Sequence, residues 1–257
     1  MTARLKSRWA AGEPAVGAWC TIPSSVPAEF LAISGFDYVG VDCQHGLPGP
    51  DSLVPMLQAI NGHDVPAVVR VPVGSGWWIQ RALDSGAEAV IVPMVNSAEE
   101  AAAAVRHCRY PPAGERSFGP IRSELVLGTA TEDVNSAVAC LVMIETRRGV
   151  EAAAEICATP GVDGVYIGPA DLAISYGLPP RLAPVAGPHA EAMERVRTAC
   201  AANAIVAGVH AANGEQAAQY LRAGYLMVTI SSDLAMMRSA ARTHLRTARE
   251  ALESWKG

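Results

Sequence analysis

The sequence predicts an α/β protein: a single (β/α)8 barrel, or TIM barrel, over residues 1–257. Three observations lead to this prediction. The chain has 257 residues, close to the length of roughly 250 that is usual for this barrel. Eight short apolar runs, rich in Val and Ile, lack polar alternation, as expected for parallel strands buried on both faces. Helix-like segments separate these runs, and no linker or low-complexity stretch divides the sequence. An open, doubly wound sheet is the alternative.

The eight expected strands share a β-branched, apolar composition, and each precedes a polar or glycine-containing segment. They are expected at Val16–Ile22, Tyr38–Cys43, Pro66–Val71, Ala89–Met94, Cys140–Glu145, Gly164–Gly168, Ile205–Val209 and Leu226–Ile230.

The helices are expected between and after these strands, and glycine directly follows four of them, as in a C-terminal cap. Four arginines at helical spacing on the last helix indicate a solvated face or, alternatively, a face that docks on another subunit. The stretch 109–139 interrupts the alternation, and a loop of that length is usually functional or an interface element. The expected helices are Pro27–Ser34, Asp51–Asn61, Trp77–Ser85, Ala98–Cys108, Gly149–Ala158, Ala190–Ala202, Glu215–Ala223 and Leu234–Glu253.

Lysine is nearly absent from the sequence, which excludes several kinds of chemistry. Of the 20 basic residues, 18 are Arg and only Lys6 and Lys256 are Lys. The body of the fold therefore has no lysine for a Schiff base with a carbonyl substrate or pyridoxal phosphate. A phosphate-binding P-loop, which needs a Gly-Lys pair, is excluded as well.

Charge and cysteine content predict the kinds of partner and the cellular location of the protein. A net charge of −5 without a basic stripe argues against nucleic-acid binding. The six cysteines are scattered and partly within apolar runs, so we expect reduced, mostly buried thiols rather than disulfides. Neither a signal peptide nor a membrane span is expected, because no suitable apolar stretch is present. We therefore expect a cytoplasmic protein without a membrane partner.

Polar residues follow the expected strands, at the end where barrel enzymes carry their active sites. Trp19 lies in the first strand, Asp42 and His45 end the second, and Arg70 ends the third. Glu145, Asp171 and His210 follow the fifth, sixth and seventh strands. Taken singly, each has a structural explanation: a loop histidine, an ion-paired arginine, a salt-bridged glutamate or a helix N-cap. Together they favour an active site.

Two of these carboxylates suggest a metal site. Glu145 and Asp171 would follow adjacent strands, and one or two carboxylates suit Mg²⁺ or Mn²⁺. Such a cation would chelate a 2-oxo acid and act as a Lewis acid toward a developing enolate. Arg70 would add positive charge at the same oxygen, and His45, oriented by Asp42, would move a proton. The turn Gly168-Pro169-Ala170 would receive the substrate carboxylate through backbone N–H groups.

Six segments, in order along the chain, resemble the metal-dependent (class II) pyruvate aldolases of the 4-hydroxy-2-oxoheptanedioate / 2-dehydro-3-deoxyglucarate aldolase family. They are GFDYVGVDCQHG, PAVVRVP, GAEAVIVPMVNSAEEA, RYPPAGERSFG, MIETRRGVE and GVDGVYIGPADLAISYG. The resemblance covers most of the chain, and the IGPADL, RYPPAG and D-x-x-H-G segments are the most specific.

The resemblance implies a catalytic set and an assembly. Arg70 would stabilise the pyruvate enolate, and His45 would be the acid/base, with Asp42 and Asp84 as supporting carboxylates. The family also implies a last helix that exchanges with a partner, and dimers that assemble into a homohexamer. Metal ligands are implied at Glu145 and Asp171 for Mg²⁺, Mn²⁺ or Co²⁺, and substrate contacts at Trp19, Gly168, Pro169, Ala170 and Asp171.

Three residues depart from the family pattern. Gln44 replaces an acid before the motif histidine, and Met143 replaces a glutamine two residues before the metal-binding glutamate. His210, where some relatives have an apolar residue that faces the aldehyde, adds a hydrogen-bonding group to the substrate-binding set. Met143 is the departure expected to change substrate choice most.

The function predicted from the sequence is reversible cleavage of a 4-hydroxy-2-oxo acid to pyruvate, or hydroxypyruvate, and an aldehyde through a metal-stabilised enolate. Three alternatives remain open. They are an oxaloacetate decarboxylase, a lyase of malyl-CoA or citramalyl-CoA that would use the 109–122 loop for the nucleotide, and a non-catalytic barrel that binds a 2-oxo acid.

Overall fold

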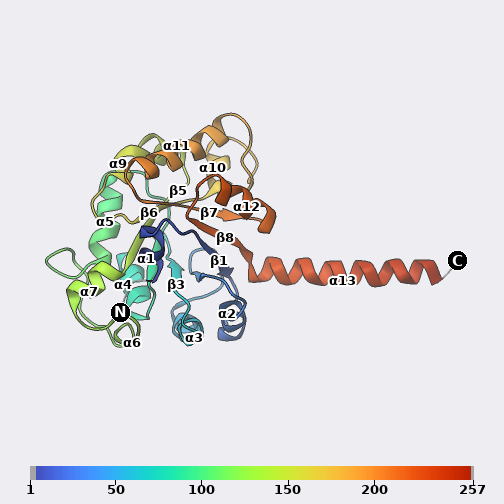
Figure 1. Ribbon diagram of the computed structural model, residues 1–257, viewed down its shortest axis with the longest axis horizontal. Coiled ribbons are helices and arrows are strands. Elements are labelled where there is room, and N and C mark those ends of the chain that lie inside the picture. Colours follow the sequence, from blue (N-terminus) through green and yellow to red (C-terminus); the bar gives the residue numbers. More distant parts are fainter. Residues whose placement is uncertain (1–3, 256–257) are drawn as a thin grey trace.

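The computed structural model describes residues 4–255 and contains a closed barrel of eight parallel strands (Figure 1). Each strand pairs with the next in sequence, and β8 pairs with β1 to close the barrel. The predicted barrel is thus confirmed, and the alternative of an open sheet was wrong. The strands are β1 Ala15–Cys20, β2 Tyr38–Asp42, β3 Ala67–Arg70, β4 Ala89–Val92, β5 Ala139–Ile144, β6 Gly164–Ile167, β7 Val206–Ala211 and β8 Met227–Ser232.

The helices cover the outside of the barrel, and serine, threonine or asparagine side chains cap several of their N-termini, among them Ser75 and Asn213. The helices are α1 Arg4–Ala10, α2 Ser25–Ala32, α3 Pro50–Asn61, α4 Gly76–Asp84, α5 Ala98–Cys108, α6 Glu124–Leu127, α7 Thr131–Ala137, α8 Arg147–Glu151, α9 Ala153–Cys157, α10 Pro169–Ser175, α11 Pro188–Ala202, α12 Gly214–Arg222 and α13 Asp233–Trp255.

Three details differ from the prediction. The helix expected at Gly149–Ala158 is two short helices, α8 and α9, because the backbone leaves helical geometry at Ala152 (φ −88°, ψ 6°). The 109–139 interruption contains α6 and α7, which are too short to give a helical period in the sequence. Helix α1 was not predicted, although its Leu5 and Trp9 pack against the residues inside the barrel.

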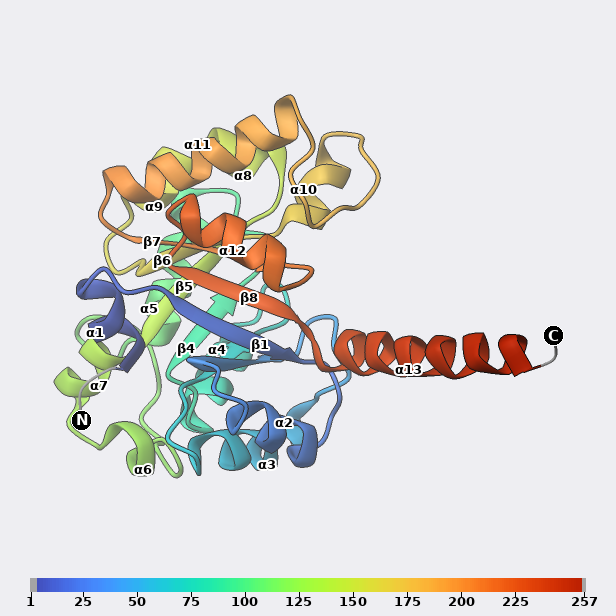
Figure 2. The same cartoon turned by 45° about the vertical axis from the view of Figure 1, so that its right-hand side comes forward.

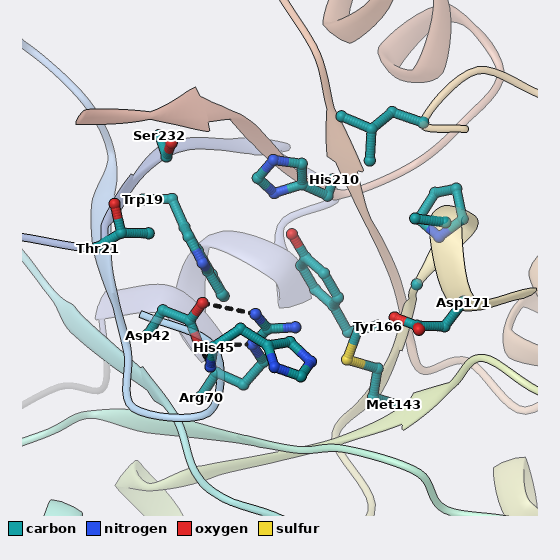
Figure 3. Close-up of a pocket in the computed structure, with 14 residues that line it drawn as sticks. Trp19, Thr21, Asp42, His45, Arg70, Met143, Tyr166, Asp171, His210 and Ser232 are labelled. Carbon is teal, nitrogen blue, oxygen red and sulfur yellow. Dashed lines mark hydrogen bonds and ion pairs between the residues drawn. The ribbon is translucent and has the colours of Figure 1, made fainter. Parts of the chain in front are cut away.

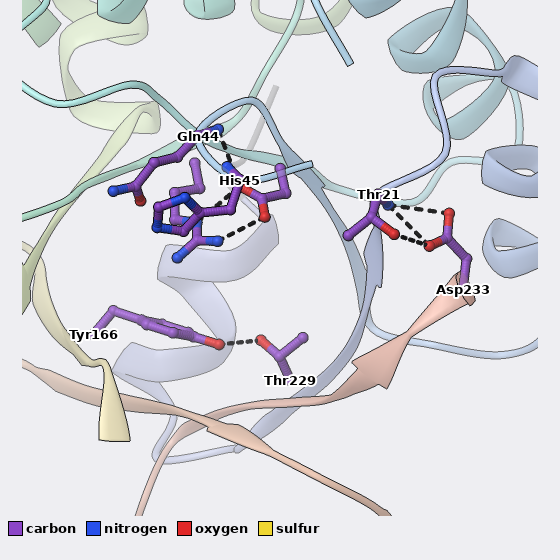
Figure 4. Close-up of polar contacts among 8 residues, drawn as sticks. Thr21, Gln44, His45, Tyr166, Thr229 and Asp233 are labelled. Atoms are coloured by element: carbon purple, nitrogen blue, oxygen red, sulfur yellow. Dashed lines mark hydrogen bonds and ion pairs between the residues drawn. The ribbon is translucent and has the colours of Figure 1, made fainter. Parts of the chain in front are cut away.

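The apolar side chains form two layers. One fills the barrel interior, where alternate strand residues such as Tyr38, Ile91 and Leu141 point inward. The other lies between the strands and the helices. Each fully buried Leu or Ile adds about 1.5–3 kcal/mol of transfer free energy. Within the interior layer, the hydroxyls of Tyr38 and Tyr166 both bond Thr229, so the buried phenols are satisfied (Figure 4 shows the Tyr166 bond).

Helix α13 stands away from the barrel in both views (Figures 1 and 2). Its first residue, Asp233, accepts hydrogen bonds from the backbone N–H groups of Thr21 and Ile22, which hold the start of the helix at the end of β1 (Figure 4 shows the Thr21 bond). The exchange of this helix between subunits stays a prediction. Large apolar side chains along α13 are exposed at Leu234, Met237, Leu245, Leu252 and Trp255.

Other expectations concern cysteine and membranes. All six cysteines are free and buried, as predicted. Across residues 4–255, no helix combines the length and the apolar character needed to cross a bilayer. Lys6 forms an ion pair with Asp163 (2.7 Å) at the amino ends of the strands, while Lys256 lies outside the described residues.

Candidate active site

A pocket of about 270 Å³ opens at the carboxyl ends of the strands (Figure 3). Nine residues predicted for the site line it together, contributed by strands or loops around the barrel. They are Trp19, Asp42, His45, Arg70, Gly168, Pro169, Ala170, Asp171 and His210. Barrel topology explains their convergence, because the parallel strands all end at the same rim.

Asp42 and Arg70 form the best-defined contact in the pocket. They are register partners on β2 and β3, and Arg70 donates two hydrogen bonds to the Asp42 carboxylate, from Nε (2.9 Å) and Nη2 (2.6 Å). Both side chains are largely buried. Arg70 therefore forms the buried ion pair expected of a structural arginine, and it also lines the pocket. Its guanidinium carbon lies 5.4 Å from the centre of the Trp19 ring.

The same carboxylate shapes the loop that carries His45. Asp42 Oδ1 accepts the backbone N–H groups of Gln44 (3.1 Å) and His45 (3.2 Å) (Figure 4). Asp42 thus contacts His45 through the backbone N–H of that residue. Burial raises the pKa of Asp42, but the Arg70 bonds and charge and the two N–H donors outweigh burial and leave the pKa below its usual value. A β-carbon at Gly46 would meet Asp42 O at 2.3 Å, so this tight turn requires glycine.

Glu145 and Asp171 lie together at the ends of β5 and β6. Glu145 is buried, and its Oε1 accepts the backbone N–H of Met94 (2.9 Å). Burial, together with the charge of Asp171 and a hydrogen bond between the two carboxyl groups, raises the pKa of Glu145 to about 7, against the opposing effects of Met94 N–H and Arg70. A β-carbon at Gly168 would lie 2.5 Å from Glu145 Oε2, so only glycine leaves room for this carboxyl group.

This carboxyl pair fits a hard divalent cation. Two neighbouring carboxyl groups repel each other when both are ionised, and a divalent cation between them would relieve this repulsion. Within residues 4–255, no group of three or more His, Cys, Asp or Glu side chains has metal-binding geometry. The donor set therefore suits an ion that keeps water or substrate oxygens as further ligands, such as Mg²⁺ or Mn²⁺, better than zinc.

Aromatic residues form one wall of the pocket. Trp19 stacks on Tyr166 with ring centres 6.0 Å apart, and His210 meets Trp19 edge-on at 5.9 Å. Burial lowers the pKa of His210 to about 4, and the positive charge of Arg70 acts in the same direction. The His210 imidazole is therefore neutral at neutral pH, with one hydrogen-bond donor and one acceptor.

Asp84 lies apart from the pocket. It is the last residue of α4, so it lies toward the amino ends of the strands, where its carboxylate accepts a hydrogen bond from Arg116 Nη2 (2.7 Å). Arg116 is buried and lies over the Tyr110 ring. Within one chain, this geometry gives Asp84 a structural ion pair, and the supporting catalytic role stays a prediction.

Met143, the departure from the family pattern expected to change substrate choice most, lines the pocket from β5. Four further lining residues were not predicted. Tyr166 points inward from β6, and the alternation of strand residues would have indicated it. Thr21 directly follows β1 and Ser232 is the last residue of β8, and both line the pocket. Leu182 comes from the loop between α10 and α11, where no periodicity marks a side chain as inward-facing.

Comparison with known proteins gives consistent results. The pattern of the HpcH/HpaI aldolase/citrate lyase family matches residues 16–240. A hydroxypyruvate/pyruvate aldolase of Paraburkholderia phytofirmans is 35% identical, with 95% of this chain and 97% of the relative aligned. A 4-hydroxy-2-oxo-heptane-1,7-dioate aldolase of Klebsiella pneumoniae is 36% identical, with 94% and 92% aligned.

Among solved structures, an HpcH/HpaI aldolase/citrate lyase family protein of Burkholderia cenocepacia superposes with a TM-score of 0.88. It is 35% identical, and the match covers 96% of this chain and 100% of that one. Sequence and fold agree with the pocket described above: the chain belongs to the HpcH/HpaI aldolase/citrate lyase family and is an aldolase, a carbon–carbon lyase.

Proposed function

We propose that the protein is a class II aldolase that reversibly cleaves a 4-hydroxy-2-oxo acid to pyruvate, or hydroxypyruvate, and an aldehyde. The observation that carries the proposal is the pair of carboxyl groups of Glu145 and Asp171. Asp171 lines the pocket together with Arg70, and Glu145 lies buried behind Asp171 without lining the pocket. The names of the two relatives, which specify hydroxypyruvate/pyruvate and 4-hydroxy-2-oxo-heptane-1,7-dioate, support this substrate class.

Glu145 and Asp171 would hold the divalent cation, Mg²⁺, Mn²⁺ or Co²⁺. When bound, the cation would supply a positive charge that stabilises the enolate oxygen of the 2-oxo acid. The proximity of the two carboxyl groups supports this assignment, because one or two carboxylates suit a hard divalent cation.

The protein groups each have a proposed role. Arg70, fixed by Asp42, directs its remaining N–H groups toward the oxygen on which negative charge develops. His45 moves the proton at the reacting carbon, or at the hydroxyl of the cleaved substrate. Trp19 and the turn at Gly168, Pro169 and Ala170 line the space for the 2-oxo acid, and His210 contacts the aldehyde.

The enolate is formed without an imine in this proposal. An enamine route needs a core lysine, and Lys6 is held by Asp163 at the far end of the barrel. Borohydride reduction in the presence of pyruvate should therefore leave the enzyme active and add no mass. An internal pyruvyl adduct would contradict the proposal.

We also infer a homo-oligomer, a hexamer built from dimers, in which α13 exchanges between subunits. The exposed apolar residues of α13 recur at intervals of three or of seven to eight residues along one side, as in a helix that packs on a partner. The six free, buried cysteines support the cytoplasmic location.

The proposed function is tested by two measurements on the purified enzyme. The first is deuterium exchange into the methyl group of pyruvate, before and after exhaustive EDTA treatment and after Mg²⁺, Mn²⁺ or Co²⁺ is restored. The second is cleavage of a panel of 4-hydroxy-2-oxo acids, with pyruvate release as the readout. We expect metal-dependent exchange and cleavage. Full activity after EDTA would contradict the metal assignment, and rapid oxaloacetate decarboxylation without aldol cleavage would favour the decarboxylase.

A further inference from the structure

The loop between α10 and α11, residues 177–187, contributes a side chain to the pocket. Its sequence, GLPPRLAPVAG, holds three prolines, which restrict the backbone and favour a fixed conformation. Leu182, near the middle of this loop, lines the pocket and is partly exposed to it. The proposed chemistry assigns no role to this residue.

Two buried side chains of α12 hold Leu182 by its backbone. The carbonyl oxygen of Leu182 accepts hydrogen bonds from Tyr220 Oη (2.8 Å) and Gln216 Nε2 (2.9 Å). Gln216 also accepts the backbone N–H of Ala212 (2.7 Å), which directly follows β7. The loop is thereby tied to the strand that carries His210.

A third anchor fixes the end of the loop. His189, fully buried on α11, accepts the backbone N–H of Val185 at Nδ1 (3.0 Å), so its Nε2 carries the proton and donates to Pro169 O (3.0 Å). Pro169 is the first residue of α10, the helix that carries Asp171 in its first turn. The loop is therefore hydrogen-bonded at Leu182 and Val185 and stays in place as part of the pocket wall.

The anchors place Leu182 on one side of the pocket. Helix α12 packs on β7 and β8, whereas Arg70 ends β3 on the other side of the barrel. The 2-oxo acid is proposed to lie between Arg70 and the Glu145–Asp171 pair, so Leu182 and His210 face the remaining space, which the aldehyde would occupy.

We propose that Leu182 limits the length of the aldehyde that the enzyme accepts, and that Tyr220 and Gln216 are positioning residues that hold it there. This inference rests on the proposed aldolase function. A hydrogen-bonded, proline-rich wall resists displacement, so a long alkyl chain would clash with Leu182 instead of moving it. The preferred acceptors are then short aldehydes.

The experiment measures kcat/KM for aldol addition of pyruvate to acetaldehyde and to pentanal, and compares their ratio among variants. Leu182→Ala should raise the pentanal to acetaldehyde ratio about tenfold, the size of effect that a few methylene groups have in an apolar pocket. Leu182→Phe should lower the ratio. These opposite changes keep the test valid if one variant folds poorly, which thermal unfolding would reveal.

Tyr220→Phe tests the positioning role, because it removes one of the two hydrogen-bond donors to Leu182 O. This variant should raise the pentanal to acetaldehyde ratio, as Leu182→Ala does, but by a smaller factor. Tyr225→Phe is the matched control: its ring lies 5.2 Å from that of Tyr220, and it should leave the ratio unchanged. If Tyr220 acts through Leu182, Tyr220→Phe should have no further effect on the ratio in the Leu182→Ala background.

The outcomes separate this inference from the proposed function. No deuterium exchange into pyruvate by the wild-type enzyme would overturn the aldolase proposal and the inference with it. If the wild-type enzyme catalyses deuterium exchange into pyruvate but both Leu182 variants keep the wild-type pentanal to acetaldehyde ratio, the inference alone is overturned. Equal effects of Tyr220→Phe with and without Leu182→Ala would overturn the positioning role.

Discussion

Arg70 and Asp42 are joined by two hydrogen bonds across neighbouring strands, 2.9 Å from Nε and 2.6 Å from Nη2. Asp42 also binds the backbone of the loop that carries His45. A single buried carboxylate therefore fixes both the cationic group and the histidine loop of the proposed mechanism. Substitution of Asp42 should disturb stability and catalysis together.

The first prediction concerns the stability that Asp42 contributes. Removal of one partner from a buried ion pair costs about 3–5 kcal/mol, because the other charge is left uncompensated. Asp42→Asn should therefore lower the free energy of unfolding by about 3 kcal/mol in urea titrations. The exposed Asp51→Asn is the control and should change it little. Unchanged stability in Asp42→Asn would contradict the importance of the pair.

The pH dependence of this contribution has a definite sign. Because the pKa of Asp42 is below its usual value of 3.8 in the folded protein, the unfolded chain binds a proton more readily. The contribution is complete well above pH 3.8 and is lost as the pH falls through the lower, folded pKa. Between about pH 5 and pH 3, wild-type stability should decline more steeply than that of Asp42→Asn.

The second prediction concerns catalysis by Arg70. Arg70→Ala removes the fixed N–H donors at the proposed enolate oxygen, and loss of such a donor costs about 10²–10³-fold in rate. Deuterium exchange into the pyruvate methyl group should fall by that factor, whereas exchange by the surface variant Arg222→Ala should match wild type. A wild-type exchange rate in Arg70→Ala would refute the role.

The third prediction concerns the protonation of His210, which faces Trp19, Arg70 and Asp42. Its pKa of about 4 in the folded protein lies below the usual 6.5, so its stabilising contribution is complete above pH 6.5 and is lost as the pH falls to 4. We expect a loss of about 3 kcal/mol over this range, and His210→Gln should lack it. NMR titration of the imidazole checks the pKa directly, and a value near 6.5 would contradict the burial argument.

The fourth prediction concerns the metal ligands. A cation that binds only the folded protein raises the unfolding temperature. Mn²⁺ should therefore stabilise the wild-type protein, and Glu145→Gln and Asp171→Asn should respond far less. Glu151→Gln, an exposed position on α8, is the matched control and should respond like wild type. Equal stabilisation of all four proteins would place the metal elsewhere.

The sequence predicted the features that depend on local pattern. Eight apolar runs became the barrel strands, and the polar residues that end them, such as Arg70 and Asp171, meet at one rim because barrel strands are parallel. The Asp42–Arg70 pair depends on the register between β2 and β3, which composition leaves open.

Other features depend on contacts between distant segments. Leu182 reaches the pocket because Tyr220 and Gln216, more than 30 positions away, bind its carbonyl, and a loop sequence has no period that would indicate this. Asp84 was predicted from the resemblance alone, and its Arg116 partner lies within the irregular 109–139 segment. The split at Ala152 was missed because both short helices bury residues at helical spacing.

The fifth prediction concerns assembly through α13. Leu245 and Leu252 lie seven residues apart on one side of the helix and are 51% and 53% exposed in the single chain. If the helix exchanges between subunits, each leucine would be buried there and contribute about 1.5–3 kcal/mol. The double variant Leu245→Glu, Leu252→Glu should therefore dissociate into smaller species, as measured by light scattering during gel filtration. Thr247→Glu adds charge on the other side of α13 and should keep the wild-type mass. An unchanged mass for the double variant would show that this side of α13 does not hold the assembly together.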